Sequence, residues 1–174
     1  MVDLGAVWDE HIRREFVLRD ADSTMRTMAD EPVLVEVPVG TGGRGREAAH
    51  AFYRDYFIPA WPDDAEVVPI SRTVDDERVV DEILVRFTHS RVMPFWLPGV
   101  APTGRRVELP HVVVVGFDGG EVAYEHVYWD QASLLVQIGL LDPEQLPVLG
   151  AEQARRLVEH DPSNDFIQRR TKEA

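Results

Sequence analysis

The sequence predicts an α+β fold in which helices pack on one side of a curved antiparallel sheet. Two observations support it: helical periodicities occur near the N-terminus, and long runs of strand-forming residues lie between residues 66 and 130. Helices segregated from antiparallel strands are typical of this class. With 174 residues, the chain has about the size of one domain. We expect one domain over residues 1–150. Residues 151–174 are expected to form a C-terminal helix, at about 151–160, followed by a loose polar tail.

The N-terminal helices are predicted from apolar spacing and capping residues. Residues 3–19 repeat apolar side chains every four residues, which indicates an amphipathic helix. His11 lies beside this apolar stripe and is interpreted as a half-buried helix histidine. A short second helix is expected after residues 20–23, whose acidic and hydroxyl side chains are good caps.

The next segment is predicted to contain a strand, a loop and a third helix. Pro32 ends the second helix, and residues 33–37 form a short strand. Residues 40–45 are rich in glycine but lack the lysine of a phosphate-binding loop, so we interpret them as a flexible loop. They lead into a helix over residues 46–57, where Tyr53 can face the sheet.

The sheet is predicted to occupy residues 66–130. Strands are expected at residues 66–73, 78–89, 105–117 and 121–130, because these runs are rich in β-branched and aromatic residues. Gly119 and Gly120 indicate a tight hairpin turn between the last two strands. The apolar loop before the third strand contains Phe95 and Trp96 between prolines. Such a loop must be buried, cover a pocket mouth or contact a partner subunit.

The last predicted strand carries a mixture of apolar and titratable side chains on one face. Strand alternation places five residues there: Val122, Tyr124, His126, Tyr128 and Asp130. The two-residue turn predicts that His111 lies near Val127, although a one-residue bulge would change the pairing. His126 and Asp130 can both border one small substrate, with Tyr128 between them.

A family resemblance is carried by the pattern WDxxxLLxQxG, which runs from Trp129 to Gly139. This pattern resembles the end of the SnoaL-like polyketide cyclases, in the nuclear-transport-factor-2-like superfamily. Thr88-His89, residues 97–110 and residues 125–133 are similar to bacterial proteins often called ester cyclases. The resemblance covers roughly residues 5–150. It implies a cone-like, cystatin-like roll, in which N-terminal helices wrap a curved antiparallel sheet around an internal cavity.

The resemblance also implies a reaction and candidate catalytic residues. SnoaL-like cyclases use acid/base chemistry next to a carbonyl group in an apolar cavity, without a cofactor. The Asp that matches Asp130 is their general acid/base, so Asp130 is the first candidate catalytic residue and His126 is the second. Burial beside Trp129 would suit Asp130 for proton transfer near neutral pH. The alternative role of Asp130 is to cap the helix that begins at Gln131.

Eight further residues are predicted to bind the substrate: His111, Tyr128, Trp129, His89, Glu82, Tyr53, Phe95 and Trp96. Glu82 can instead form an ion pair with Arg86. No HxH or HExxH spacing supports a metal site, so we expect no metal. The resemblance to SnoaL-like cyclases implies that no cofactor is needed. The alternative function is a non-catalytic binder of a small hydrophobic ligand.

Composition excludes several other classes of protein. The chain has no cysteine, which excludes disulfides and a cysteine nucleophile. Its net charge of −13 argues against binding to nucleic acid. There is neither a signal peptide nor an apolar run near the ~20 residues of a membrane span, so we expect a protein of the bacterial cytoplasm with no membrane partner. A small apolar or aromatic ligand and a homodimer are the expected partners.

Overall fold

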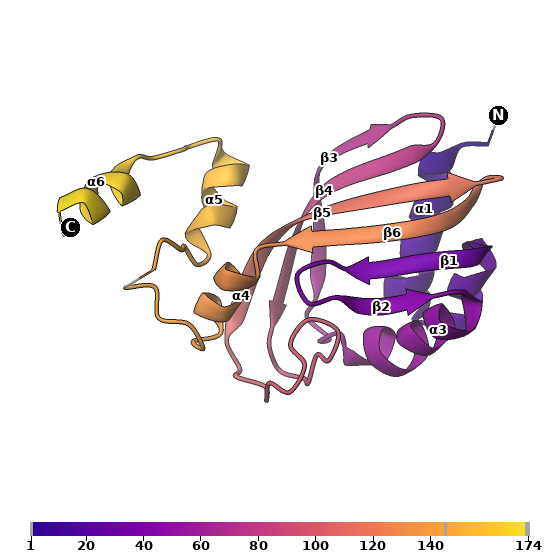
Figure 1. The fold of residues 1–174 in the computed structure, drawn as a ribbon, viewed down its shortest axis with the longest axis horizontal. Coiled ribbons are helices and arrows are strands. Elements are labelled where there is room, and N and C mark those ends of the chain that lie inside the picture. The colour runs from indigo at the N-terminus through magenta and orange to yellow at the C-terminus, as the bar shows by residue number, and fades with distance from the viewer. Residues whose placement is uncertain (1, 145, 173–174) are drawn as a thin grey trace.

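A six-stranded mixed sheet forms the centre of the fold (Figure 1). The computed structural model describes residues 2–144 and 146–172. The strands are β1 Met28–Glu36, β2 Thr41–Arg44, β3 Glu66–Val74, β4 Arg78–Thr88, β5 Arg106–Asp118 and β6 Glu121–Trp129. They lie in the order β2-β1-β6-β5-β4-β3. The predicted α+β fold is confirmed, but β1 runs parallel to β6, whereas the other neighbouring strands are antiparallel.

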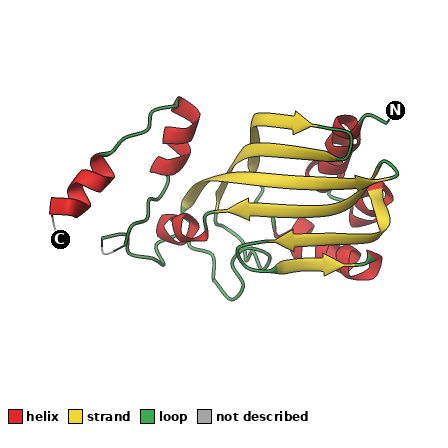
Figure 2. Cartoon of the chain, turned by 45° about the horizontal axis from the view of Figure 1, so that its top comes forward, coloured by secondary structure: helices red, strands yellow, loops and turns green. Residues whose placement is uncertain are grey.

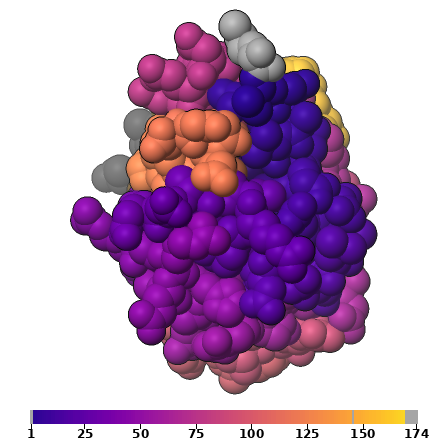
Figure 3. Space-filling view, turned by 90° about the vertical axis from the view of Figure 1, so that its right-hand side faces the viewer, coloured from indigo at the N-terminus to yellow at the C-terminus, as the bar shows by residue number. Residues whose placement is uncertain are grey.

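Helical segments near the N-terminus cover one face of this sheet (Figure 2). α1 (Leu4–Ile12) continues as the π-helical segment η1 (Arg13–Leu18), and α3 (Arg46–Ala51) continues as a second π-helical segment, η3 (Phe52–Phe57). The short elements α2 (Ala21–Thr24), η2 (Met25–Thr27) and η4 (Ile58–Ala60) connect them. Seen from the end of the molecule where the β5–β6 turn lies, N-terminal segments form much of the surface around that turn (Figure 3).

The β1–β2 hairpin replaces the flexible loop that was predicted for residues 40–45. Thr41 pairs with Glu36 and Arg44 pairs with Val33 in an antiparallel ladder. A side chain at Gly43 would bring its Cβ to 2.6 Å from the Ala48 carbonyl, so glycine allows α3 to pack directly against β2. The loop prediction was wrong because glycine was interpreted as a source of flexibility, whereas here it allows a close backbone approach.

The register of β5 and β6 decides which side chains face the helices. Gly119 and Gly120 have φ values of 60° and 90°, as the predicted tight turn requires. The turn pairs Asp118 with Glu121, and a bulge between Phe117 and Gly116 then shifts the ladder by one more residue, so His111 pairs with Trp129 and not with Val127. Glu125, which is buried, therefore faces the helices together with Trp129. From Tyr124 onward, the face that was predicted to line the cavity is the outer face of the sheet, whereas Val122, which precedes the bulge, is buried in the core.

The segment after β6 closes one end of the fold. α4 (Gln131–Gln137) follows directly, and the Gln137 side chain forms two hydrogen bonds with the backbone of Glu108 on β5, at 2.8 and 2.9 Å. α5 (Glu152–Glu159) confirms the helix expected at about residues 151–160, whereas α6 (Asp165–Lys172) lies where only a loose tail was expected. No helix in the described residues has the length and apolar character to span a membrane. The domain boundary at residue 150 stays a prediction.

Candidate functional site

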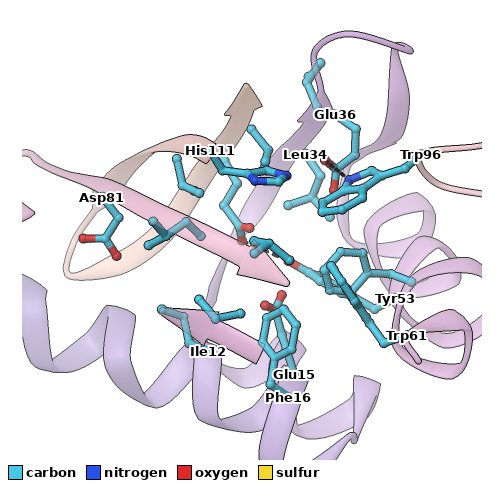
Figure 4. A pocket seen from close by; sticks show the side chains of 18 of the residues that line it. Ile12, Glu15, Phe16, Leu34, Glu36, Tyr53, Trp61, Asp81, Trp96 and His111 are labelled. Carbon is cyan, nitrogen blue, oxygen red and sulfur yellow. Dashed lines mark hydrogen bonds between the residues drawn. The ribbon is translucent and has the colours of Figure 1, made fainter. Parts of the chain in front are cut away.

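An internal cavity of ≈ 80 Å³ lies between the sheet and the N-terminal helices (Figure 4). Its walls are mostly apolar and include several aromatic side chains: Trp8, Phe16, Phe52, Phe57, Trp61 and Trp96. Ligand pockets for drug-sized molecules usually measure roughly 300–1,000 Å³. A compact ligand with few heavy atoms is therefore the best fit to this cavity.

His11 is the centre of a buried polar cluster on the wall of the cavity. Its Nε2 lies 3.0 Å from an oxygen of Glu15, 3.0 Å from an oxygen of Glu125 and 3.1 Å from the hydroxyl of Tyr53. The Tyr53 hydroxyl donates a hydrogen bond to Glu125 at 2.9 Å. The cluster therefore joins side chains from α1, η1, η3 and β6 in one network.

His11 carries a proton on both ring nitrogens, because Thr27 accepts a hydrogen bond from Nδ1–H and two carboxyl groups lie beside Nε2. The Thr27 hydroxyl donates to the Thr24 carbonyl at 2.6 Å, so its oxygen accepts a hydrogen bond from Nδ1–H of His11. Burial lowers the pKa of His11, but Glu125 and Glu15 outweigh this effect and raise it to about 10. His11 is consequently an imidazolium at neutral pH, with Nε2–H directed at two carboxyl groups.

Burial also changes the ionisation of the groups around His11. It raises the pKa of Glu15 above its ordinary value, although the neighbouring His11 acts in the opposite direction. It raises the pKa of Tyr53 well above 10, and nearby Glu125 and Glu15 add to this shift. Tyr53 is therefore a neutral hydrogen-bond donor at neutral pH.

Glu36 supplies a third buried carboxyl group, at the end of β1. Its Oε2 accepts a hydrogen bond from the indole N–H of Trp96 at 3.1 Å, which Figure 4 shows as a dashed line. Burial raises the pKa of Glu36 to about 8, because the Trp96 hydrogen bond offsets only part of the loss of hydration. At neutral pH, Glu36 is thus mostly a neutral carboxylic acid that can donate a hydrogen bond.

His111 borders the same cavity from β5. Its Nδ1 donates to the carbonyl of Leu109 at 2.8 Å, so Nε2 carries the lone pair. Burial lowers the pKa of His111 to about 4, and the ring is therefore neutral. Within the described residues, Nε2 is buried and has no hydrogen-bond partner. The ring stacks on Trp96 with 4.6 Å between the centroids.

The other end of the cavity contains a satisfied ion pair. Asp81 on β4 accepts hydrogen bonds from Trp8 at 2.8 Å and from Nη2 of Arg72 at 2.8 Å. Arg72 lies on β3 and also contacts Asp9, at 2.7 Å. The carboxylate of Asp81 is therefore neutralised by Arg72, and we assign it a structural role.

The two π-helical segments contribute to the position of the acidic and phenolic groups. Glu15 lies in η1 and Tyr53 lies in η3, and both are buried against β6. A π-helical turn holds one more residue than an α-helical turn and rotates the following side chains, and such turns occur frequently at functional sites. Both segments place a polar side chain on a face that is otherwise apolar.

Some predicted site residues do lie at this cavity. Tyr53, Trp96 and His111 line it, and their predicted role in substrate binding stays a prediction. Phe95 is fully buried beside Trp61, with 5.1 Å between the ring centroids, so the apolar loop is part of the core. Trp129 packs against Trp96, with 5.0 Å between the ring centroids, and does not itself line the cavity.

The two predicted catalytic residues do not reach the cavity. Asp130 is exposed and accepts a hydrogen bond from the Ser133 backbone N–H at 3.1 Å, which makes it the N-cap of α4. His126 is half-buried on the outer face and stacks on Tyr124 at 4.7 Å. The expected position of Asp130 inside an apolar cone was wrong, because the register turns this face of β6 away from the helices.

Three predicted substrate-binding residues also lie elsewhere. Tyr128 is 44% exposed, and it borders a shallow groove on the outer face together with Glu82 and Asp130. Glu82 accepts a hydrogen bond from the Ser71 hydroxyl at 3.0 Å, and Arg86 pairs with Glu66 and Glu108 in its place. His89 is fully buried after the end of β4 and contacts Thr103 at 3.1 Å.

The sequence prediction missed three carboxyl groups that line the cavity, Glu15, Glu36 and Glu125, and the buried His11 that joins two of them. His11 was expected to be a half-buried helix histidine, but its exposed fraction is 0%. A signal was present, since Glu15 follows His11 by four residues along the apolar stripe of the first helix. Glu125 likewise interrupts the apolar residues of the inner face of β6. An acidic residue on an apolar face is the pattern to look for.

His11, Glu15 and Glu125 are also the described residues that could hold a metal ion. One ligand atom from each lies within 4.8 Å of the others, and imidazole and carboxylate groups bind several divalent ions. These atoms already satisfy one another through the hydrogen bonds of the imidazolium. The three side chains therefore satisfy one another by hydrogen bonding without a metal ion.

Comparison with known proteins identifies relatives of this fold. The family model described as a SnoaL-like domain matches residues 9–125. TsrD from Streptomyces laurentii has 18% identity and a TM-score of 0.62, covering 81% of this chain and 100% of that one. A candidate SnoaL-like polyketide cyclase from Jannaschia sp. CCS1 has 21% identity and a TM-score of 0.59, covering 79% and 94%.

A third similar structure is a hypothetical protein from Catenulispora acidiphila with a ketosteroid isomerase-like fold, solved in complex with trimethylamine. It has 16% identity and a TM-score of 0.57, and the match covers 80% of this chain and 94% of that one. Among curated proteins, none matches the chain significantly. At these levels of identity the solved structures establish the fold alone.

Proposed function

Because the chain belongs to the SnoaL-like domain family, we propose that it is a small-molecule enzyme that moves a proton next to a carbonyl group without a cofactor. Such a step serves both ring closure and isomerisation. The observation that supports this proposal is the set of buried acid and base groups on one internal cavity: Glu15, Glu36, Glu125, Tyr53 and His111. The candidate polyketide cyclase from Jannaschia is consistent with this class of reaction.

Glu125 is the proposed general base. Its carboxyl group borders the cavity, while Oε1 is held by the Tyr53 hydroxyl at 2.9 Å and lies 3.0 Å from His11 Nε2. These contacts fix the orientation of the carboxylate, as a positioned base requires. When Glu125 accepts a proton from the substrate, the imidazolium of His11 remains paired with Glu15 at 3.0 Å.

Glu36 is the proposed acid. Removal of a proton next to a carbonyl group places negative charge on the carbonyl oxygen, and a donor fixed in a dry site stabilises that charge. Glu36 is mostly neutral at pH 7, because burial raises its pKa to about 8. A neutral carboxylic acid in an apolar pocket can donate a hydrogen bond to an enolate oxygen. Trp96 holds the second carboxyl oxygen of Glu36.

Hydrogen–deuterium exchange tests this proposal without knowledge of the natural substrate. A panel of small ketones and β-dicarbonyl compounds is incubated with the protein in D₂O, and loss of the α-proton signal is followed by NMR. We expect wild-type protein to catalyse exchange of at least one compound. The Glu125→Gln variant should be slower by about 10²–10⁴-fold, the usual contribution of general acid–base catalysis.

Asp130→Asn is the matched control, because Asn retains the ability to cap α4. Its exchange rate should equal that of the wild type. If Asp130→Asn abolishes exchange and Glu125→Gln does not, the catalytic site lies on the outer face and the proposal fails. If compounds bind in the cavity but none exchanges, the protein is a non-catalytic binder.

A further inference from the structure

The polar groups around the cavity are short of positive charge. Its described lining includes four carboxyl side chains, those of Glu15, Glu36, Asp81 and Glu125, and no Lys or Arg. Arg72 neutralises Asp81 from outside the cavity. Within the described residues, His11 is the one cation that contacts Glu15 and Glu125. The carboxyl group of Glu36 accepts a hydrogen bond from the neutral indole of Trp96.

His111 adds an unused acceptor to this cavity. Its Nδ1–H is committed to the Leu109 carbonyl at 2.8 Å, so the Nε2 lone pair must accept a hydrogen bond or remain unsatisfied. Nε2 has no partner among the described residues, and the side chain is only 2% exposed. A buried, unpaired polar atom is costly, and here it belongs to a residue that borders an empty volume. A ligand with an N–H donor would satisfy it.

The apolar wall is made of aromatic faces that attract cations. Trp61 is the centre of this wall and lies 5.3 Å from Phe16, 5.6 Å from Phe57 and 4.9 Å from Trp96, between ring centroids. Each of these rings borders the cavity. An ammonium group near aromatic faces in a dry site is stabilised by the ring quadrupoles.

We infer that the substrate carries a protonated amino group, held by the carboxyl groups and His111 Nε2 against this aromatic wall (Figure 4). The inference rests on the proposed function in one respect, because it places the substrate in the same cavity. The cavity of ≈ 80 Å³ restricts the class to compact amines with few heavy atoms. A neutral hydrocarbon of the same shape leaves His111 Nε2 without a hydrogen-bond partner and brings no positive charge to the carboxyl groups.

Binding of such a cation is linked to release of protons. The titratable groups that face the site are Glu15, Glu36, Tyr53, Asp81, His111 and Glu125, with His11 behind Glu15 and Arg72 behind Asp81. Burial raises the pKa of Glu15 and of Glu36, so both carboxyl groups hold protons beyond their ordinary range. An ammonium group beside them favours their ionised forms and lowers both pKa values.

The test compares two probes of nearly equal shape, tert-butylammonium and tert-butanol, by isothermal titration calorimetry at pH 7. We expect the ammonium ion to bind at least about 10-fold more tightly, through charge pairing and cation–π attraction. Titrations in two buffers with different ionisation enthalpies should show proton release for the ammonium ion and none for the alcohol. Equal or tighter binding of the alcohol overturns the inference.

Two variants test which groups of the cavity hold the ammonium ion. Glu15→Gln should weaken binding of the ammonium ion and leave binding of the alcohol unchanged. His111→Phe preserves a ring on Trp96 but removes the acceptor, so it should weaken binding of both probes, because the hydroxyl of tert-butanol can also donate to Nε2. Glu82→Gln, on the outer face, is the matched control and should change neither. Equal effects of Glu15→Gln on both probes, or no effect of His111→Phe on either, would overturn the inference.

The outcomes separate this inference from the proposed function. If the ammonium ion binds selectively but no carbonyl compound exchanges its α-proton, the inference holds and the enzyme proposal fails. If neutral ketones exchange through Glu125 and the ammonium ion does not bind, the enzyme proposal holds and the inference fails.

Discussion

Trp96 and Glu36 are joined inside the cavity, where the indole N–H donates to Oε2 of the carboxyl group at 3.1 Å. This contact connects the apolar loop before β5 to the end of β1. It also makes the protonation of Glu36 sensitive to a neighbour that is far away in sequence.

Trp96→Phe should raise the pKa of Glu36 further above its value of about 8, because the indole hydrogen bond favours the ionised carboxylate. The pKa can be measured by ¹³C NMR of the glutamate carboxyl signals. Trp129→Phe is the control, since the Trp129 N–H donates to Gln131 at 2.6 Å and not to Glu36. An unchanged Glu36 titration in Trp96→Phe contradicts the prediction.

Glu36 should also make the protein less stable as the pH rises. Its pKa increases from 4.5 to about 8 on folding, so the neutral form is favoured in the folded state. The unfolded chain ionises first, and stability present below pH 4.5 is lost progressively up to about pH 8. Glu36→Gln removes this dependence, so its stability relative to wild type should improve by up to about 1.4 kcal/mol per pH unit in this window.

Urea unfolding of both proteins at pH 5, 6.5 and 8 measures this difference. Glu82→Gln, an acid of the outer face, should run parallel to the wild type at all three pH values. The prediction is wrong if Glu36→Gln also runs parallel to the wild type.

His11→Gln should destabilise the protein strongly at neutral pH. The variant removes the imidazolium between Glu15 and Glu125 and leaves buried carboxyl groups without a counter-ion, which typically costs about 3–5 kcal/mol. The pKa of His11 rises from 6.5 to about 10 on folding, so its contribution is fully present below pH 6.5 and is lost as the pH rises through about 10.

Acidification should recover part of the loss in His11→Gln, because burial raises the pKa of Glu15 and this carboxyl group becomes protonated more readily. The measurement is urea unfolding at pH 7 and pH 5. His126→Gln, on the outer face, provides the comparison and should change the free energy of unfolding by less than about 0.5 kcal/mol. A small effect of His11→Gln at pH 7 would show that the cluster is not held by its imidazolium.

Asp130→Ala should act as a loss of a helix cap. The Asp130 carboxylate accepts from the Ser133 N–H, and removal of an N-cap costs about 1 kcal/mol. Asp130→Asn should recover most of this stability. Thermal unfolding of both variants measures the effect, and probe binding in the cavity should be unchanged in both. Weaker probe binding in Asp130→Asn would contradict the purely structural role of Asp130 and indicate that it takes part in ligand binding.

The strands were predictable because their residues carry a local signal. β4 was expected at residues 78–89 and is found at Arg78–Thr88, and the hairpin at Gly119 was correctly placed. Alternation and turn chemistry act between neighbours in the chain, so a single sequence contains them. The β1–β6 pairing was not predictable in this way, since it joins strands separated by most of the domain.

The site was only partly predictable, for a related reason. Both faces of β6 contain acidic and aromatic side chains, so alternation alone cannot show which face lines the cavity. The deciding contact is the hydrogen bond from Tyr53 to Glu125, between residues that are 72 positions apart. The bulge near Gly116 then changes which residues of β5 lie opposite. Neither feature has a local signature.

The two hydrogen bonds between Gln137 and Glu108 have a consequence for assembly. β6 ends at Trp129, which pairs with His111, so the first residues of β5 extend beyond their neighbour. The amide of Gln137 reproduces the donor and acceptor of a missing strand residue at Glu108. An exposed strand edge is a template on which another chain can add. Gln137, the glutamine of WDxxxLLxQxG, therefore occupies the backbone N–H and C=O of Glu108 and blocks the addition of a strand from another chain at this point.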